Sequence, residues 1–188
     1  MRAVVQHDMN DAAYDFQRVV WPVIADNIGG GQFYSTEQYR SDPIAQLLDM
    51  YAGIDGIQLS ANQIAIRGLA IRLQWCHKPY NTFTVRHTRT SGTRTEYEKR
   101  IAGLNAVRHG AIYPYFTIQA YVTKRRVGHL LSVAVTTTKT LYSYIADNNI
   151  QTRTNNDDGN EFFYVPWTEY MKHTISCSVF DENGETHA

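Results

Sequence analysis

The stretch from Ile54 to Trp75 constrains the fold of this chain more than any other. It reads IDGIQLSANQIAIRGLAIRLQW. Its second half places an apolar residue at every other position, at Leu69, Ile71, Leu73 and Trp75. A period of two is typical of a β-strand with one buried face, so Ala70, Arg72 and Gln74 would share the opposite face. With the polar turn SANQ between them, residues 54–60 and 64–75 are predicted to form an antiparallel hairpin.

The remaining sequence mixes helical and strand patterns. Helices are predicted at 11–27, 42–53, 93–109 and 140–147, with a last helical turn at 168–173. Further strands are predicted at 81–87, 112–122, 129–138 and 161–167. This order indicates an α/β (α+β) fold in which helices flank a central mixed β-sheet.

Local signals mark several helix ends. Asn10 or Asp11 can cap the first helix, Pro22 would kink it, and the glycines at 29–31 end it. Its apolar stripe is Phe16, Val19, Val20, Val23 and Ile24. Asp42 and Pro43 open the second helix. In the third, Thr95 and Glu98 form a capping box, and the apolar stripe is Tyr97, Ile101 and Leu104.

Length and composition suit one globular domain over residues 1–188, with 43% hydrophobic residues. No apolar run approaches the roughly 18 residues of a membrane helix, and the first residues lack a secretory pattern. We therefore expect no membrane partner and a cytoplasmic location, or the host cytoplasm if a phage encodes the chain. The two cysteines, Cys76 and Cys177, form no CxxC motif, so a structural zinc site has no framework.

The formal net charge of zero hides a strong segregation. Residues 1–55 hold three Lys/Arg and eight Asp/Glu, a net charge of −5. Residues 56–145 hold thirteen Lys/Arg and two Asp/Glu, a net charge of +11. Residues 146–188 hold two Lys/Arg and eight Asp/Glu, a net charge of −6. The basic middle either presents a face to a polyanion or is neutralised by acidic ends that fold back onto it.

The hairpin has a layout suited to metal-dependent phosphodiester cleavage. Such chemistry needs carboxylates that hold a divalent ion and a polar group that positions the attacking water. Asp55 stands at the head of one strand, and Arg72 and Gln74 share one face of the next. The alternative is a solvent-facing strand edge with ordinary polar residues.

The segments GIDGIQL, GLAIRLQW and NTFTVRHTRTSGTRTEYEKR together resemble the PD-(D/E)XK nuclease superfamily, which includes many restriction endonucleases. The resemblance covers roughly residues 11–122. It implies a helix, a hairpin bearing Asp and then (Asp/Glu)-x-Lys, another helix and a further strand. Asp55 matches the first carboxylate, and Gln74 falls at the lysine position, where some family members use glutamine.

The resemblance departs from the family at Arg72, which stands where the second carboxylate belongs and cannot bind a cation. Family members sometimes recruit that carboxylate from elsewhere, so Glu96, Asp49 and Asp15 become candidates. Each has an ordinary alternative. Glu96 can pair with Arg100 one turn on, Asp15 can lie on a solvated helix face, and Asp49 can be a surface acid. The expected ion is Mg²⁺ or Mn²⁺, held by Asp55 with Glu96 or Asp49.

Basic residues suggest a nucleic-acid contact. Those between 86 and 126 are interleaved with Thr and Ser, a mixture that suits phosphate groups. The candidate contacts are Arg86, Arg89, Arg94, Lys99, Arg100, Lys124, Arg125 and Arg126. The thirteen tyrosines supply possible stacking surfaces for bases, although most are expected in the core.

Motifs of other chemistries are missing: the sequence contains no HExxH, GxSxG or GxGxxG. Two hypotheses follow for a nucleic-acid partner. In the first, the protein is a Mg²⁺-dependent nuclease in which Asp55, Gln74, Glu96 and Arg72 form the catalytic site. In the second, it is a catalytically inactive, nuclease-fold nucleic-acid-binding protein. A third hypothesis is an interaction protein of a phage or mobile element.

Overall fold

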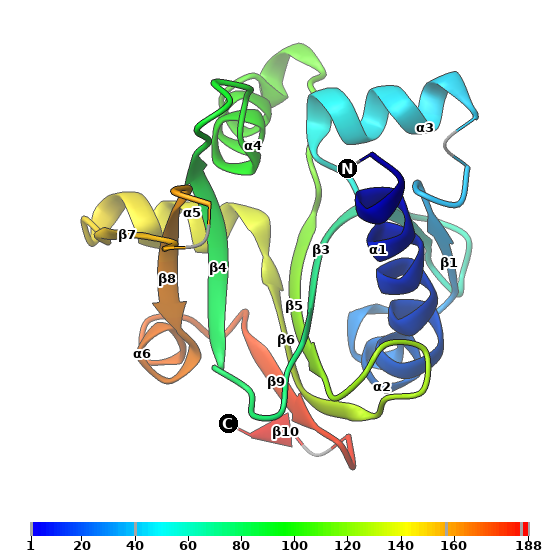
Figure 1. Ribbon diagram of the computed structural model, residues 1–188. Coiled ribbons are helices and arrows are strands. Elements are labelled where there is room, and N and C mark those ends of the chain that lie inside the picture. The colour runs from blue at the N-terminus through cyan, green and yellow to red at the C-terminus, as the bar shows by residue number, and fades with distance from the viewer. Residues whose placement is uncertain (1, 40, 157, 185, 188) are drawn as a thin grey trace.

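Two β-sheets form the framework of the protein (Figure 1). The structure is a computed structural model that describes the backbone of residues 2–39, 41–156, 158–184 and 186–187, and the side chains of 9–39, 41–156 and 158–184. The larger sheet has seven strands in the order β1-β2-β3-β5-β6-β9-β10. The smaller has three strands in the order β4-β8-β7.

The larger sheet is mixed. Its strands are β1 (Gln32–Ser35), β2 (Gly56–Leu59), β3 (Ile66–Trp75), β5 (Phe116–Val122), β6 (Leu130–Thr137), β9 (Ser178–Asp181) and β10 (Thr186–His187). Neighbouring strands are antiparallel except β3 and β5, which are parallel, with Leu69 opposite Phe116. The smaller sheet, of β4 (Thr82–Thr88), β7 (Thr152–Thr154) and β8 (Glu161–Pro166), is antiparallel. The predicted mixed sheet flanked by helices is confirmed.

The first helix is longer than the sequence pattern predicts. It comprises α1 (Arg2–Asp15), a π-helical turn (Phe16–Val20), α2 (Trp21–Ile24) and a 3₁₀ turn (Asp26–Ile28). The expected cap at Asn10 or Asp11 is therefore wrong, because both residues lie inside α1. Just before Pro22, the N–H of Trp21 donates to the carbonyl of Phe16, which makes one wide turn at this place. Gly29, in the left-handed conformation, ends the segment as predicted.

The other helices follow their sequence signals. Asp42 caps α3 (Pro43–Leu47), which a π-helical turn (Leu48–Ala52) extends to Gly53. The Thr95–Glu98 capping box opens α4 (Glu96–Asn105), and a 3₁₀ turn (Val107–His109) follows it. Near the C-terminal end of the chain lie α5 (Thr138–Asp147) and α6 (Trp167–Met171). No helix in the described part of the chain is both long and apolar enough to cross a membrane.

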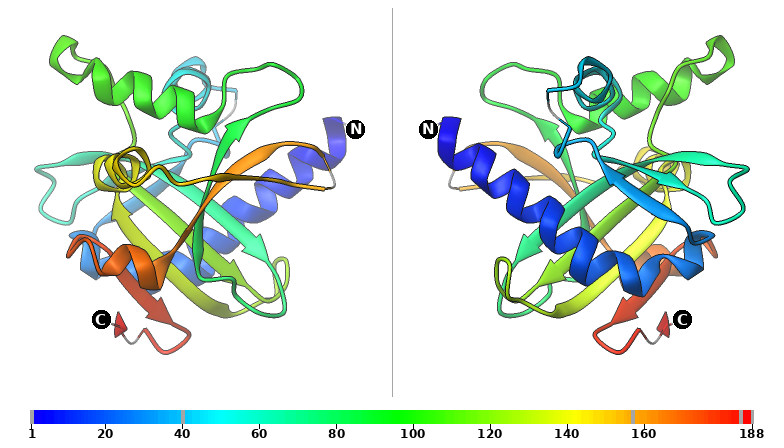
Figure 2. Two further views of the ribbon diagram at one scale, coloured as in Figure 1. Left: turned by 90° about the vertical axis from the view of Figure 1, so that its left-hand side faces the viewer. Right: turned by 90° about the vertical axis from the view of Figure 1, so that its right-hand side faces the viewer.

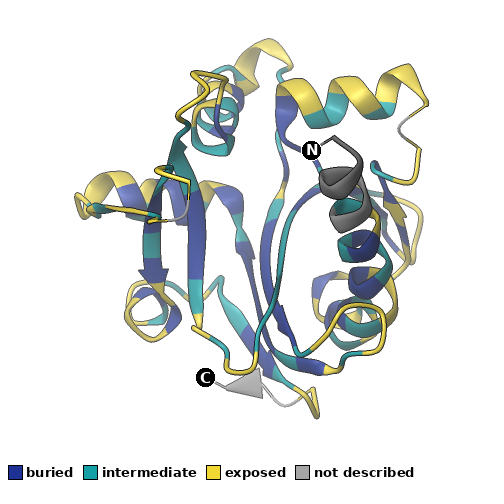
Figure 3. Ribbon diagram, viewed as in Figure 1, coloured by how far each residue is buried: buried dark blue, intermediate teal, exposed yellow. Residues whose placement is uncertain are grey.

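The seven-stranded sheet separates two hydrophobic cores (Figures 2 and 3). On one face, the π-helical turn packs through Phe16 and Val20 and α2 packs through Ile24, all fully buried. On the other face, the three-stranded sheet, α5 and α6 enclose a core rich in rings, including Phe83, Tyr142, Trp167 and Tyr170. The stripe of α4, Tyr97, Ile101 and Leu104, packs against this second core as predicted.

The predicted hairpin is present, and its faces are as expected. Gly56 of β2 lies opposite Leu69 of β3, and Leu59 lies opposite Ile66. Leu69 is fully buried in the first core, and Ile71, Leu73 and Trp75 pack against it. Arg72 therefore points to the opposite side of the sheet, toward β4 and α4. This orientation decides where the candidate site lies.

Candidate functional site

The site is a small cavity between the two sheets, about 70 Å³ in volume. Asp55 lies at its edge, immediately before β2. The N–H of Asp55 donates to the carbonyl of Leu69, and its Oδ2 accepts a hydrogen bond from the N–H of Ile71 at 2.7 Å. These two contacts fix the carboxylate across the hairpin and direct it into the cavity.

The environment of Asp55 disfavours its ionised form. Burial raises the pKa of this carboxyl to about 7, although Arg100 and the hydrogen bond from Ile71 oppose the rise. The negative charges of Asp49 and Glu96 raise it further. The oxygen atoms of Asp55 thus lie where more positive charge would be favourable.

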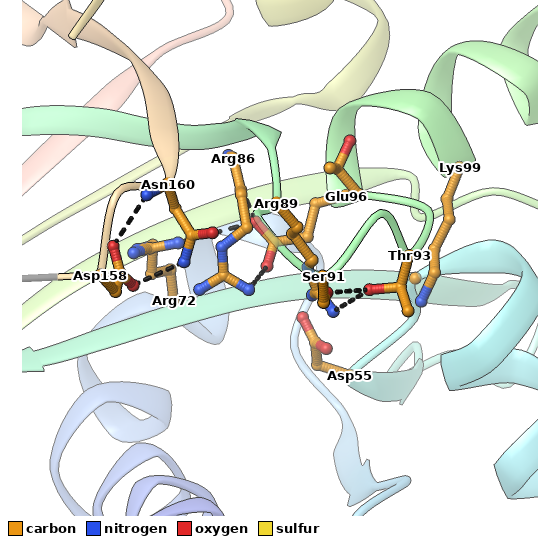
Figure 4. A network of polar contacts seen from close by, with 12 residues as sticks. Asp55, Arg72, Arg86, Arg89, Ser91, Thr93, Glu96, Lys99, Asp158 and Asn160 are labelled. Atoms are coloured by element: carbon orange, nitrogen blue, oxygen red, sulfur yellow. Dashed lines mark hydrogen bonds and ion pairs between the residues drawn. The ribbon is translucent and has the colours of Figure 1, made fainter. Parts of the chain in front are cut away.

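Glu96 reaches the same cavity from the first turn of α4 (Figure 4). Its Oε2 lies 3.6 Å from Nη1 of Arg72, and its Oε1 lies 3.6 Å from Nη1 of Arg86. Burial by itself would raise the pKa of Glu96, but the guanidinium groups of Arg72, Arg100 and Arg86 outweigh it and lower the pKa. Glu96 is therefore ionised.

Arg100 is buried beneath these groups. Its Nη2 lies 3.9 Å from Oδ2 of Asp55 and 3.5 Å from the carbonyl of Gly53, and its Nη1 donates to the hydroxyl of Tyr142 at 3.1 Å. This guanidinium was expected on an exposed basic face, and its burial places it outside any such face. Its closest carboxylate partner is Asp55, whereas Glu96 forms its ion pairs with Arg72 and Arg86.

Arg72 and Arg86 stack side by side against one ring. Their guanidinium carbons lie 4.9 Å and 5.3 Å from the ring centre of Phe162 on β8. The Nε atoms of both are buried and have no hydrogen-bond partner within the described chain. A buried donor without an acceptor is costly, so these two Nε atoms are unfavourable features of the arrangement as it stands.

Gln74 does not reach Asp55 through any contact that the structure shows, but it is part of an amide pair. Its Oε1 accepts a hydrogen bond of 3.4 Å from Nε2 of Gln119 on β5. Oε1 of Gln119 in turn accepts from the N–H and the hydroxyl of Thr84. Gln119, not Gln74, lines the cavity that holds Asp55 and Glu96.

Two carboxylate side chains in the cavity are candidate ligands for a divalent ion. Asp55 and Glu96 both line the cavity, and Mg²⁺ is commonly held by one or two carboxylates together with water and substrate phosphate. Asp49 affects Asp55 through its charge but is not among the lining residues. The described residues contain no group of three His, Cys, Asp or Glu placed for a metal. Both carboxylates also face guanidinium groups, Asp55 that of Arg100 and Glu96 those of Arg72 and Arg86.

Some predicted basic contacts lie near the cavity. Arg89 donates to the hydroxyl of Thr93, and Arg94 to the carbonyl of Glu98, both at 3.4 Å. Nζ of Lys99 donates to the carbonyl of Asp49. Arg94 is exposed, and the other two side chains are partly exposed. Figure 4 shows Arg89 and Lys99 near Asp55 and Glu96, and Arg94 and Lys99 line a separate pocket beside α3.

The turn Lys124–Arg126 lies elsewhere, beyond the opposite end of β5 (Figure 1). The guanidinium of Arg126 forms an ion pair with Asp11, and that of Arg125 lies 4.4 Å from the ring centre of Trp75. The acidic N-terminal helix thus neutralises part of this turn. The basic middle of the chain forms two separate groups, not one continuous face.

Asp15 has a structural role, which corrects the expectation of a solvated acid. It is completely buried and accepts a hydrogen bond from the indole Nε1 of Trp75 at 2.8 Å. Both of its carboxylate oxygens also accept from the N–H of Arg126 at 3.0 Å. Asp15 therefore fastens α1 to the end of β3 and to the β5–β6 turn.

Sequence reasoning did not identify Phe162, Gln119 or Tyr142. A signal for Phe162 was available, because the strand EFFYVP carries aromatic residues at adjacent positions and must therefore present rings on both faces. Gln119 and Tyr142 carry no local signal. Their roles arise from β5 and α5 packing beside the hairpin.

Comparisons with known proteins add no family to this description. No protein-family model, no curated protein and no solved structure matches the chain significantly.

Proposed function

We propose that this protein binds nucleic acid at the cavity and hydrolyses a phosphodiester there, as a Mg²⁺- or Mn²⁺-dependent nuclease of the PD-(D/E)XK type acting in the cytoplasm. One observation carries the proposal: Glu96 enters the cavity that Asp55 borders and lies against Arg72. The carboxylate of Glu96, on α4, thus lies beside Arg72, the residue that stands at the family's second carboxylate position.

The order of elements supports the same reading. A helix precedes β1, α3 follows β1, and β2 and β3 then form an antiparallel hairpin with Asp55 immediately before β2. The chain then passes through β4, a strand of the smaller sheet, and through α4 to β5, which lies parallel to β3. The first helix, the hairpin, α4 and β5 follow one another in the order that the sequence resemblance implies, with β1, α3 and β4 as additional elements.

Each side chain has a role in this proposal. Asp55 and Glu96 would hold the ion, which supplies Lewis-acid polarisation and lowers the pKa of a water. Arg72 and Arg86 would stabilise negative charge on the phosphate oxygens through their guanidinium groups. Gln119, oriented by Thr84 and Gln74, positions the water. Arg100 acts through Asp55 and is a positioning residue.

A second candidate is a nucleic-acid-binding protein without catalysis. Its specific support is the double ion pair of Glu96, whose two carboxylate oxygens face Arg72 and Arg86 at 3.6 Å. In that reading the arginines bind a phosphate as they stand. Asp55 is protonated below pH 7 and carries no ion.

Cleavage assays with matched variants separate the two candidates. Plasmid, single-stranded circular DNA and RNA would be incubated with Mg²⁺, Mn²⁺ or EDTA. The nuclease proposal expects metal-dependent cleavage by the wild type that Asp55→Asn and Glu96→Gln abolish while binding persists. Glu169→Gln, an exposed acid on α6 paired with Lys172, is the control that keeps full activity.

Two other results would overturn the nuclease proposal. If the wild type binds nucleic acid but cleaves none of these substrates with either metal, the second candidate replaces the first. If it binds none of them at low salt, both are overturned. Calorimetric titration of Mn²⁺ into the wild type and into Asp55→Asn tests metal binding directly. If both proteins release or absorb the same heat of binding, Asp55 is not a ligand.

A further inference from the structure

A second, larger cavity of about 570 Å³ adjoins the candidate site. It lies between the end of β3 and the face of the three-stranded sheet that points away from the second core. Gln74 borders it on β3, Thr84 on β4 and Tyr164 on β8. Thr84 lines both cavities, so the two adjoin at this residue.

Side chains of β4 and β8 alternate between the second core and the larger cavity. Phe83, Val85, Phe163 and Val165 point into the second core. The side chains between them, including Thr84 and Tyr164, point into the larger cavity. Thr84 and Tyr164 are direct neighbours in the register of β4 and β8, and Arg153 of β7 pairs with Phe162 on the same face. The groove is therefore a regular surface, held by the ladder of three strands.

The chemistry of this groove combines rings, one cation and neutral polar groups. The guanidinium of Arg153 lies 5.7 Å from the ring centre of Tyr164. Tyr80, whose side chain is 73% exposed, offers a second ring at the rim. Thr82 and Thr154 add hydroxyls, and Gln74 adds an amide. Among the described residues, none of those that line the groove is acidic.

These features match a nucleotide whose base is not stacked in a duplex. Tyrosine rings bind the π-face of a base, which is free in a single strand but covered by neighbours in a double helix. A guanidinium near the ring and the absence of lining carboxylates favour the phosphate of the same nucleotide. Arg153 is one of only two Lys/Arg residues in the acidic segment 146–188, and it is the one that borders the groove.

We infer that this groove binds one or two single-stranded nucleotides adjoining the phosphate in the smaller cavity, with a base stacked on Tyr164 and a phosphate on Arg153. The substrate class is then single-stranded nucleic acid, or an unpaired end or flap of a duplex. The inference rests on the proposed function, because the smaller cavity must receive the neighbouring phosphate.

Binding of matched oligonucleotides tests the inference. The probes are a short fluorescent oligothymidylate and a blunt duplex of equal length, measured by anisotropy at one fixed salt concentration in EDTA. Tyr164→Ala is expected to weaken binding of the single strand by about 5- to 150-fold, the range for loss of one stacked base, and to leave the duplex unchanged. Tyr164→Phe keeps the ring and should retain most of the affinity.

Controls come from equivalent surface residues outside the groove. Tyr39→Ala removes a tyrosine that is 54% exposed in the turn before α3, and it should leave both affinities unchanged. Arg153→Ala should weaken the single strand more than Arg108→Ala, which removes an exposed arginine after α4. Thermal unfolding followed by circular dichroism confirms that each variant is folded.

The failure of the inference differs from the failure of the proposed function. A wild type that binds neither probe overturns both. A wild type that binds single strand and duplex with equal affinity, both insensitive to Tyr164→Ala and Arg153→Ala, overturns the groove and leaves the function of the smaller cavity standing. If Tyr164→Phe and a folded Tyr164→Ala lose equal affinity for the single strand, the proposed base stacking on Tyr164 is wrong and its hydroxyl group makes the contact.

Discussion

Nη1 of Arg72 lies 3.6 Å from Oε2 of Glu96, so the arginine of strand β3 faces a carboxylate delivered by helix α4. The two residues are 24 positions apart in the sequence. The ion pair places positive and negative charge together at the cavity that Asp55 also borders. Removing either residue would leave the partly buried charge of the other without its counter-charge.

Glu96→Gln should destabilise the protein by about 1–3 kcal/mol, because it leaves Arg72 and Arg86 without a counter-charge in a partly buried place. Urea unfolding at neutral pH measures this difference. Glu169→Gln removes an exposed carboxylate paired with Lys172 and should change the unfolding free energy by less than about 0.5 kcal/mol. Equal effects of the two variants would show that the Glu96 ion pairs contribute little.

The stability of the metal-free protein should depend on Asp55 across a defined pH window. The pKa of this carboxyl is about 7 in the folded protein and 3.8 as the ordinary value, so the folded state holds the proton more tightly. The resulting stabilisation is present at low pH and is lost as pH rises through 7. Asp55→Asn lacks this titration and should gain stability relative to the wild type between about pH 4 and 7.

Urea unfolding in EDTA at several pH values checks this expectation. The difference in unfolding free energy between Asp55→Asn and the wild type should grow with pH and level off above about 7. A difference that stays constant over the whole range would mean that Asp55 titrates normally. Adding Mn²⁺ to the wild type should reduce the loss at high pH if Asp55 holds the ion.

Asp15→Ala should destabilise the protein by about 3 kcal/mol, because it leaves the indole N–H of Trp75 and the backbone N–H of Arg126 without their acceptor. Asp15→Asn retains one carbonyl oxygen and should lose less. Urea unfolding of both variants gives the comparison. A change below about 0.5 kcal/mol for Asp15→Ala would instead fit a residue on a solvated helix face.

Arg89→Ala combined with Arg94→Ala should flatten the dependence of log K on log salt for duplex DNA by up to about 1.8, if each residue contacts one phosphate. Lys124→Ala, beyond the opposite end of β5, should leave the slope unchanged. Anisotropy titrations over a range of salt concentrations measure both. A larger change for Lys124→Ala than for the double variant would move the binding surface to the β5–β6 turn.

The sequence by itself determined the local elements of this protein. The period of two in residues 66–75 placed Leu69 and Arg72 on opposite faces, because neighbouring side chains of a strand must point in opposite directions. The Thr95–Glu98 capping box located the start of α4 within one residue. Such signals depend on atoms a few residues apart, so the sequence contains everything needed to read them.

Elements without a strong local signal were missed. The strands β1, β7 and β9 have four, three and four residues, too few for a reliable alternation. They are strands because a neighbour offers free backbone groups, as β2 does to β1. The start of the first helix at Arg2 was also missed, because Asp11 resembles a cap but instead lies within α1 and pairs with Arg126.

Only the tertiary structure decided the roles of the charged residues. Arg100 and Asp15 look like surface residues in the sequence, yet both are buried among partners from distant segments, such as Trp75, 60 positions from Asp15. Glu96 meets Arg72 because the crossover from β3 to the parallel strand β5 carries α4 over the end of the sheet. Charge is cheap in water and costly in the interior, so the role of an ionisable residue depends on which partners the whole fold brings to it.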